Sequence, residues 1–162
     1  MKTLILYATK YGAAREIAER IAKRLDGAEL FDLKQGAAPE LTGYDRVVVG
    51  SSIYAGSIRK EAKKYLQTHE SQLCEKCLGL FLSGIGAEGS EGFFSRNFSQ
   101  KLQDAAGAKA FLGGIFQPDK VGSMERRIFK AATKSAEYAN TISDDKIDAF
   151  ALALSSDSVS TP

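Results

Sequence analysis

The chain has 162 residues, a length that fits one domain with a sizeable core. Hydrophobic residues make up 44% and charged residues 26%, and the net charge of +2 is too mild to indicate nucleic-acid binding. No apolar run approaches the roughly 20 residues that span a bilayer, and the opening apolar run is too short for a signal peptide, so we expect a cytoplasmic protein.

The first half of the chain alternates apolar runs with amphipathic stretches. Residues 3–7 form a continuous apolar run, which is typical of a strand buried on both faces. Residues 13–25 carry apolar side chains at i, i+4 spacing and charged ones between them, which predicts a helix that Gly27 would cap. Residues 28–33 predict an edge strand, and residues 45–50, with three consecutive valines, predict a central one.

The second half repeats this alternation. It predicts strands over 78–83 and 108–116 and helices over 59–73, 91–105, 124–134 and 143–154. Because parallel strands need crossover connections, five apolar strands separated by helices indicate a doubly wound α/β fold with a parallel sheet. We expect one domain over residues 1–154 and a disordered tail over 155–162, which is rich in Ser, Asp and Thr.

The two cysteines, Cys74 and Cys77, form a single C-x-x-C motif. A four-cysteine metal site would need a second pair, and the lone His69 cannot complete a site by itself, so no metal is expected. The favoured interpretation is a pair of small side chains at the start of a strand, with a redox dithiol as the alternative.

The segment from Ala8 to Ala14 joins the first predicted strand to the first predicted helix. A tight turn of this kind directs backbone N–H groups and a helix N-terminus at one point, which favours a phosphate dianion. Thr9 would add a hydroxyl, and Gly12 would allow close approach of the backbone. The alternative is an ordinary strand-to-helix turn without a ligand.

Residues 4–18, LILYATKYGAAREIA, resemble the N-terminal signature of the flavodoxin family. In that family an aliphatic strand leads into S/T-x-x-G-x-T and then a helix with alanine four positions on, and Thr9, Gly12 and Ala18 match. Ala14 departs, because the family usually has a hydroxyl residue there. One hydrogen bond to the phosphate is therefore lost, which weakens FMN binding by about 1–2 kcal/mol. The resemblance implies a flavodoxin-like five-stranded sheet of order 2-1-3-4-5 that holds FMN non-covalently.

The resemblance also implies two further cofactor loops, since FMN in this architecture lies where the strand order reverses between the first and third strands. One loop follows the third strand from Gly50 to Ser57, and the other follows the fourth from Ser83 to Gly89. Tyr54 is expected to flank the isoalloxazine, with a surface position as the alternative. The expected cofactor-binding residues are Thr9, Lys10, Tyr11, Gly12, Ala13, Ala14, Ser51, Ser52, Ile53, Tyr54, Ala55, Gly56, Ser83, Gly84, Ile85 and Gly86. No catalytic side chain is expected, because a flavin carries the redox chemistry itself.

Further runs resemble one branch of the family, the flavodoxin-type, menaquinone-dependent protoporphyrinogen dehydrogenases. These runs are Met1–Leu6, Arg15–Ala18, Tyr44–Gly50 with Ser52, Ile53 and Gly56, and Gly113–Phe116. Residues 117–142 stand in the place of that branch's insert, and they are basic but less aromatic than the branch pattern.

The branch resemblance implies a tetrapyrrole donor and a quinone acceptor. The basic insert would steer the tetrapyrrole carboxylates, or would make peripheral contact with the inner face of an anionic membrane. The alternative is a solvated helix that packs Ile128, Phe129 and Ala132 on the sheet.

We therefore expect an FMN-dependent oxidoreductase with a small-molecule or protein redox partner and no nucleic acid. One alternative is a flavodoxin-type electron carrier, although such carriers are usually strongly acidic and the net charge here is +2. The other is a flavin-free binding domain, which only Ala14 supports. A phosphoacceptor receiver domain is disfavoured, because Tyr7, Ala8 and Thr9 stand where its acidic cluster would be.

Overall fold

The computed structural model describes residues 1–86, 91–133 and 137–156, without the side chains of residues 132 and 133. The strands are β1 (Thr3–Ala8), β2 (Glu29–Asp32), β3 (Arg46–Tyr54), β4 (Ser57–Ile58), β5 (Cys77–Ser83), β6 (Ala106–Phe111), β7 (Ile115–Phe116) and β8 (Ala139–Asn140). The helices are α1 (Ala13–Ala22), α2 (Lys60–Cys74), α3 (Glu91–Asn97), α4 (Gln100–Ala105), α5 (Ser123–Thr133) and α6 (Asp144–Ser156). Single 3-10 turns cover Leu33–Gln35, Leu41–Gly43 and Pro118–Lys120.

The long strands form one parallel sheet in the order β2-β1-β3-β5-β6. These are the five strands that the sequence predicts, and their order, 2-1-3-4-5 when only they are counted, is confirmed. Two-residue β4 adds a sixth strand, antiparallel to the end of β3. The order reverses between β1 and β3, and this places a crevice at the carboxyl ends of these two strands.

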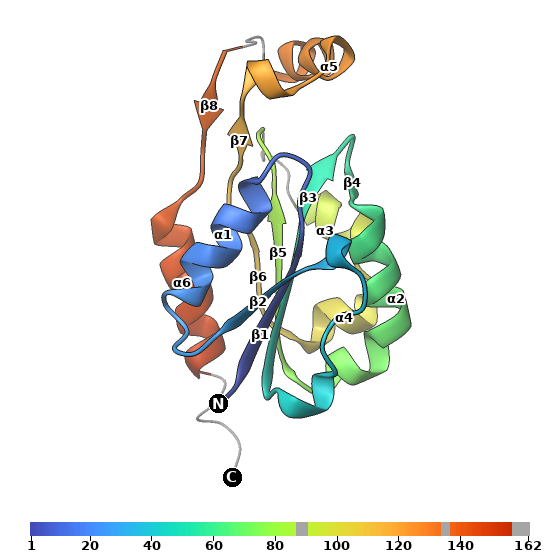
Figure 1. The fold of residues 1–162 in the computed structure, drawn as a ribbon, viewed down its shortest axis with the longest axis vertical. Helices are drawn as coiled ribbons and strands as arrows, with labels where there is room; N and C mark the ends of the chain where they lie inside the picture. Colours follow the sequence, from blue (N-terminus) through green and yellow to red (C-terminus); the bar gives the residue numbers. More distant parts are fainter. Residues whose placement is uncertain (87–90, 134–136, 157–162) are drawn as a thin grey trace.

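Helices cover both faces of the sheet. Helices α1 and α6 lie on one face, and α2, α3 and α4 lie on the other (Figure 1). Because β1 is buried on both faces, its side chains alternate between two apolar clusters: Leu4 and Leu6 pack under α2, whereas Ile5 and Tyr7 pack under α1. The apolar run of residues 3–7 is therefore explained by burial on both faces of the sheet, as the sequence predicts.

Two predicted elements are each divided in the structure. The predicted helix 91–105 breaks between α3 and α4, because the Ser99 hydroxyl accepts a hydrogen bond from Leu102 N (3.2 Å) and starts a new helix. The predicted strand 108–116 ends at Phe111, and Gly113, with φ of 91°, turns the chain out of the sheet before β7.

The predicted loop after the third strand is largely strand. β3 runs to Tyr54, and a tight hairpin then leads into β4. Its two central residues, Ala55 and Gly56, have φ of 50° and 79°, as the turn of a two-residue hairpin requires. The loop prediction was wrong here, because the triple valine marks only the part of the strand that is buried on both faces.

Residues 115–133 and 137–140 project beyond the sheet as a separate arm. β7 and β8 pair antiparallel with each other and carry α5 at their far end, over the carboxyl edge of the sheet (Figure 1). The final helix runs to Ser156, and the predicted tail lies outside the described residues from 157 onward. Within the described parts of the chain, no helix is both long and apolar enough to cross a membrane.

Candidate functional site

A cavity of about 340 Å³ opens at the carboxyl ends of β1, β3, β5 and β6. All but three of the expected cofactor-binding residues line it: Thr9, Lys10, Tyr11, Ala13, Ser52, Ile53, Tyr54, Ala55, Gly56, Ser83, Gly84, Ile85 and Gly86. The structure therefore brings together side chains from three separate segments that the sequence analysis singled out. The volume of the cavity lies in the ordinary range for a small-molecule or cofactor site.

The three expected residues outside the lining have other positions. Gly12 borders a hollow on the outer side of α1. Ala14 is fully buried in the apolar cluster under α1, so it can offer the site only its backbone N–H. The Ser51 hydroxyl donates to Ser52 O (2.9 Å) and accepts from Arg59 N (2.9 Å), at the start of α2. Both hydrogen bonds are made within the protein and point away from a role in the cavity lining.

The turn between β1 and α1 has the geometry of an anion site. Gly12 precedes the helix with φ of 100° and ψ of −7°, and its N–H donates to the Thr9 hydroxyl at 2.9 Å. The N–H groups of the first helical turn have no acceptor within the helix, and they carry the positive end of its dipole. They can therefore hold a phosphate, with Thr9 fixing the shape of the turn.

Aromatic side chains make up much of the remaining wall. Phe93 and Phe111 approach with ring centroids 6.3 Å apart, and Phe116 stacks on Phe129 of α5 at 3.5 Å. Tyr54 lies at the rim, 36% exposed, on the β3–β4 hairpin. An apolar cavity with a polar turn at one end fits a flat ring system that carries a phosphate.

The hairpin that carries Tyr54 is held by Asn97, at the end of α3. The Asn97 amide donates to Gly56 O (2.9 Å) and accepts from Ile58 N (3.0 Å). A side chain far away in the sequence therefore fixes the rim of the cavity.

Two hydroxyl groups in the cavity wall have no hydrogen-bond partner within the described part of the chain. They belong to Ser52 and Ser83, which are direct neighbours across β3 and β5. Both oxygen atoms are buried, and Ser83 is only 1% exposed. A buried hydroxyl without a partner is costly, so these two groups favour a polar ligand edge at this point.

We expect Ser83→Ala to weaken FMN binding about five- to tenfold, because it removes one hydrogen-bonding group from the wall. The ligand-free protein should be equally stable or slightly more stable, since the lost hydroxyl has no partner there. Titration followed by flavin fluorescence, together with urea unfolding of the apoprotein, measures both effects. Ser71→Ala, at an exposed position of α2, is the control, and equal FMN affinity in all three proteins would show that Ser83 does not contact the ligand.

The turn after β1 also contacts α5. The Glu125 carboxylate accepts hydrogen bonds from both the Lys10 ammonium and the Tyr11 hydroxyl. Partial burial acts to raise the pKa of Glu125, but the hydrogen bonds from Lys10 and Tyr11 outweigh it and hold that pKa below its ordinary value. The hydrogen bond to Glu125 raises the pKa of Lys10. Both groups are therefore charged at neutral pH.

Some lining residues were not among the expected ones. They are Phe93, Phe111, Gly114, Ile115, Phe116, Val121, Glu125, Ile128 and Phe129. Most belong to the arm or to the end of β6. The branch resemblance includes Gly113–Phe116 but implies no site role for it. Of the three side chains that the solvated-helix alternative names, Ile128 and Phe129 line the cavity, whereas the Ala132 side chain lies outside the description.

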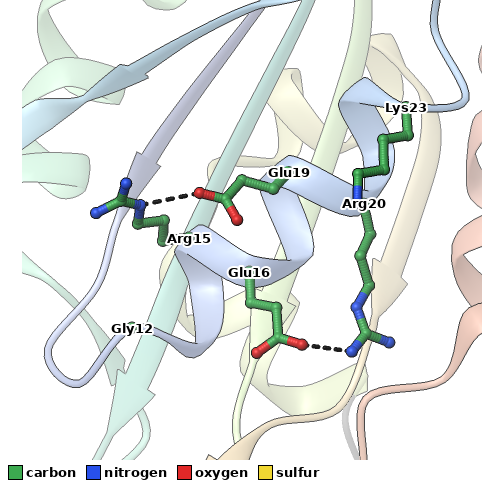
Figure 2. A pocket seen from close by; sticks show the side chains of 6 residues that line it. All are labelled: Gly12, Arg15, Glu16, Glu19, Arg20 and Lys23. Carbon is green, nitrogen blue, oxygen red and sulfur yellow. Dashed lines mark hydrogen bonds and ion pairs between the residues drawn. The ribbon is translucent and has the colours of Figure 1, made fainter.

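A second hollow, of about 400 Å³, lies on the exposed side of α1 (Figure 2). Its charged side chains pair along the helix, Arg15 with Glu19 at 3.0 Å and Arg20 with Glu16 (Figure 2). Exposed i, i+4 pairs of this kind form a solvated helix face. We assign no ligand to this hollow.

The C-x-x-C motif does not contribute to the cavity. The Cys74 thiol faces Lys101 O of α4 (3.8 Å), whereas the Cys77 thiol faces Leu154 O of α6 (3.4 Å), on the opposite side of the sheet. Both thiols are free. His69 stacks on Tyr65 within α2, and the described residues contain no cluster of three potential metal ligands of the His, Cys, Asp or Glu type.

Comparison with known proteins gives consistent matches. A family model described as a flavodoxin domain matches residues 4–143. Protoporphyrinogen IX dehydrogenase [quinone] of Escherichia coli K12 is 35% identical over 77 residues, which make up 45% of this chain and 42% of that protein. The Leishmania major protein of the same name is 31% identical over 77 residues, 44% of this chain and 33% of the relative. The matched stretch thus spans less than half of either relative.

Solved structures match over nearly the whole chain. Oxidised flavodoxin 2 from Bacillus cereus has a TM-score of 0.59 and 22% identity, covering 97% of this chain and 99% of that one. Fusobacterium nucleatum flavodoxin bound to flavin mononucleotide has a TM-score of 0.58 and 12% identity, covering 96% and 98%. At these identities the likeness establishes the fold.

Proposed function

This chain belongs to the flavodoxin domain family, and from that premise we propose that it binds FMN in the cavity at the carboxyl edge of the sheet and acts as an oxidoreductase. The observation that carries the proposal is the cavity itself. An anion-binding turn lies at one end, and apolar walls with two unpartnered hydroxyl groups lie beside it. When bound, FMN would supply the electron-transfer chemistry.

The chain's own residues would bind and shield the cofactor. The backbone of Thr9–Ala13 and the N-terminus of α1 would hold the phosphate. Tyr54 and the glycines at 84 and 86 would lie against the ring, and Ser52 and Ser83 would offer hydroxyl groups to its polar edge. The arm with α5 would limit access of water to the cavity.

We further propose an anionic tetrapyrrole as electron donor and a quinone as acceptor. Support comes from the named relatives, which are protoporphyrinogen IX dehydrogenases, and from the position of the basic arm at the cavity. Arg126 donates to Pro118 O (2.7 Å) and so secures α5 on its own arm, whereas Arg127 lies exposed.

Peripheral membrane contact through residues 117–142 is also part of the proposal. On α5, Met124 is 71% exposed and Ile128 45% exposed, one turn apart on a helix that also carries arginines. Exposed apolar and basic side chains on one short helix are typical of helices that lie at a lipid surface.

An electron-carrier flavodoxin is the second candidate, favoured by the match to flavodoxins over nearly the whole chain. The net charge of +2 disfavours it, because such carriers are usually strongly acidic. A flavin-free binding domain is less well supported, since the two unpartnered hydroxyl groups favour a ligand.

The proposal is tested by absorption spectra of the purified protein, with and without added FMN. Anaerobic protoporphyrinogen IX should bleach the flavin bands, and menadione should restore them. Flavin that binds but ignores the tetrapyrrole would favour the carrier, and no flavin uptake would reject the cofactor assignment.

A further inference from the structure

The contact between the phosphate turn and α5 has an uncommon composition. A single carboxylate, that of Glu125, accepts from an ammonium and a phenol that are neighbours in the sequence, Lys10 and Tyr11. The Lys10 ammonium also lies 4.4 Å from the centroid of the Tyr54 ring. All four residues line the cavity, so the contact is part of its wall and rim.

The carboxylate in this contact is largely withdrawn from water. The Glu125 side chain is 16% exposed and that of Lys10 is 30% exposed. A carboxylate at this depth needs a compensating cation and donors, and Lys10 and Tyr11 supply both. The lowered pKa of Glu125 agrees with a stabilised anion.

The position of Glu125 therefore shows what chemical group this part of the cavity accepts. The Glu125 carboxylate is held here by side-chain donors, whereas the N-terminus of α1 would hold an oxyanion by backbone N–H groups. Glu125 is carried on α5 of the arm, where Phe129 stacks on Phe116 of β7. Because Glu125 lies outside the sheet, it can leave the two donors without breaking a strand pairing.

We propose that the Lys10 ammonium and the Tyr11 hydroxyl form an oxyanion subsite at the cavity rim, that Glu125 occupies it in the ligand-free chain, and that an anionic group of a ligand displaces Glu125. The inference rests on the proposed function in requiring that the cavity bind a ligand. The displaced carboxylate would move into water, and α5 would lose its tie to the turn. Ligand charge would then control the opening of the arm.

The oxyanion can come from two sources, the phosphate of FMN or a carboxylate of the redox substrate. The test is Glu125→Gln, which keeps the shape of the occupant and removes its charge. In the first titration series, the apoprotein is titrated with FMN and with riboflavin, which lacks the phosphate. In the second series, the FMN-loaded protein is titrated with 2-naphthoate and with 2-naphthamide, its uncharged counterpart.

Loss of the competing charge should raise the affinity for the anionic member of a pair about tenfold, and leave that for the neutral member unchanged. A gain for FMN alone identifies the phosphate as the displacing group, and a gain for naphthoate alone identifies a substrate carboxylate. Either result supports the subsite. Equal gains in affinity for charged and neutral ligands, or affinity changes below about twofold in both titration series, would overturn the subsite. Glu125 would then act only by its volume or not at all.

Lys10→Met is the reciprocal variant, and it should lower the affinity for the anionic member of the responding pair and leave that for the neutral member unchanged. Glu75→Gln, which removes an exposed carboxylate at the far end of α2, is the matched control and should change nothing. If the wild-type protein takes up no FMN, the naphthoate pair is titrated against the flavin-free protein. Failure of the cofactor proposal is thereby separated from failure of the subsite.

Discussion

Gly50→Ala is expected to lower the free energy of unfolding by about 3 kcal/mol. Gly50 lies in the middle of β3, opposite Phe81 of β5. A Cβ atom at position 50 would lie 2.0 Å from two carbons of the Phe81 ring. That ring is fully buried and meets Phe150 of α6 edge-on at 6.4 Å, so it has no free space to move into.

Thermal and urea unfolding of the purified variant measure this effect, and the midpoint should fall by about 6–12 °C for a domain of this size. Gly43→Ala is the control, because a Cβ atom there would meet nothing within 4 Å. Its stability should stay within about 0.5 kcal/mol of the wild type. A loss below about 1 kcal/mol for Gly50→Ala would mean that Phe81 finds another rotamer.

The central sheet could be predicted from the sequence because its strands are buried on both faces. Leu4, Ile5 and Leu6 form an uninterrupted apolar run, and such runs separated by amphipathic helices leave few topologies other than a parallel sheet. The turn at Thr9–Gly12 was likewise predictable, since strand, glycine and helix are adjacent in the chain. Both features depend on local order alone.

The arm could not be predicted in the same way. Its two strands pair Ile115 with Asn140 and Phe116 with Ala139, partners more than twenty residues apart, and each strand is only two residues long. No periodicity is visible over two residues. The amphipathic pattern of α5 predicts a helix but does not say what its apolar side faces. In the structure this side faces the cavity, through Ile128 and Phe129.

The role of Glu125 was missed for a related reason. Acidic residues in a basic insert are ordinary surface residues by composition, and only the fold brings Glu125 to Lys10, 115 positions away in the chain. Ala14 shows the converse. The resemblance assigns its position to the phosphate site, whereas its side chain is enclosed in the cluster under α1.

Gly114→Ala is expected to weaken FMN binding by about 100-fold or more, which corresponds to ~2.7 kcal/mol. A Cβ atom at position 114 would lie 2.7 Å from the carbonyl carbon of Gly84 and 2.8 Å from its oxygen. The Gly84 N–H donates to Gly113 O at 3.1 Å, so the backbones after β5 and β6 are in direct contact here. Because backbone atoms cannot rotate aside, the Gly84 segment must shift, and that segment is part of the cavity wall.

Flavin fluorescence titration measures the loss, and circular dichroism distinguishes a displaced loop from an unfolded chain. Gly122→Ala is the control: Gly122 lies on the arm, a Cβ atom there would meet nothing within 4 Å, and the variant should bind FMN as the wild type does. Wild-type FMN affinity in Gly114→Ala would show that the segment after β5 does not contact the cofactor. The proposed binding mode would then reduce to the phosphate turn and the β3–β4 hairpin, because Gly84 contributes to the wall only through the backbone that this substitution displaces.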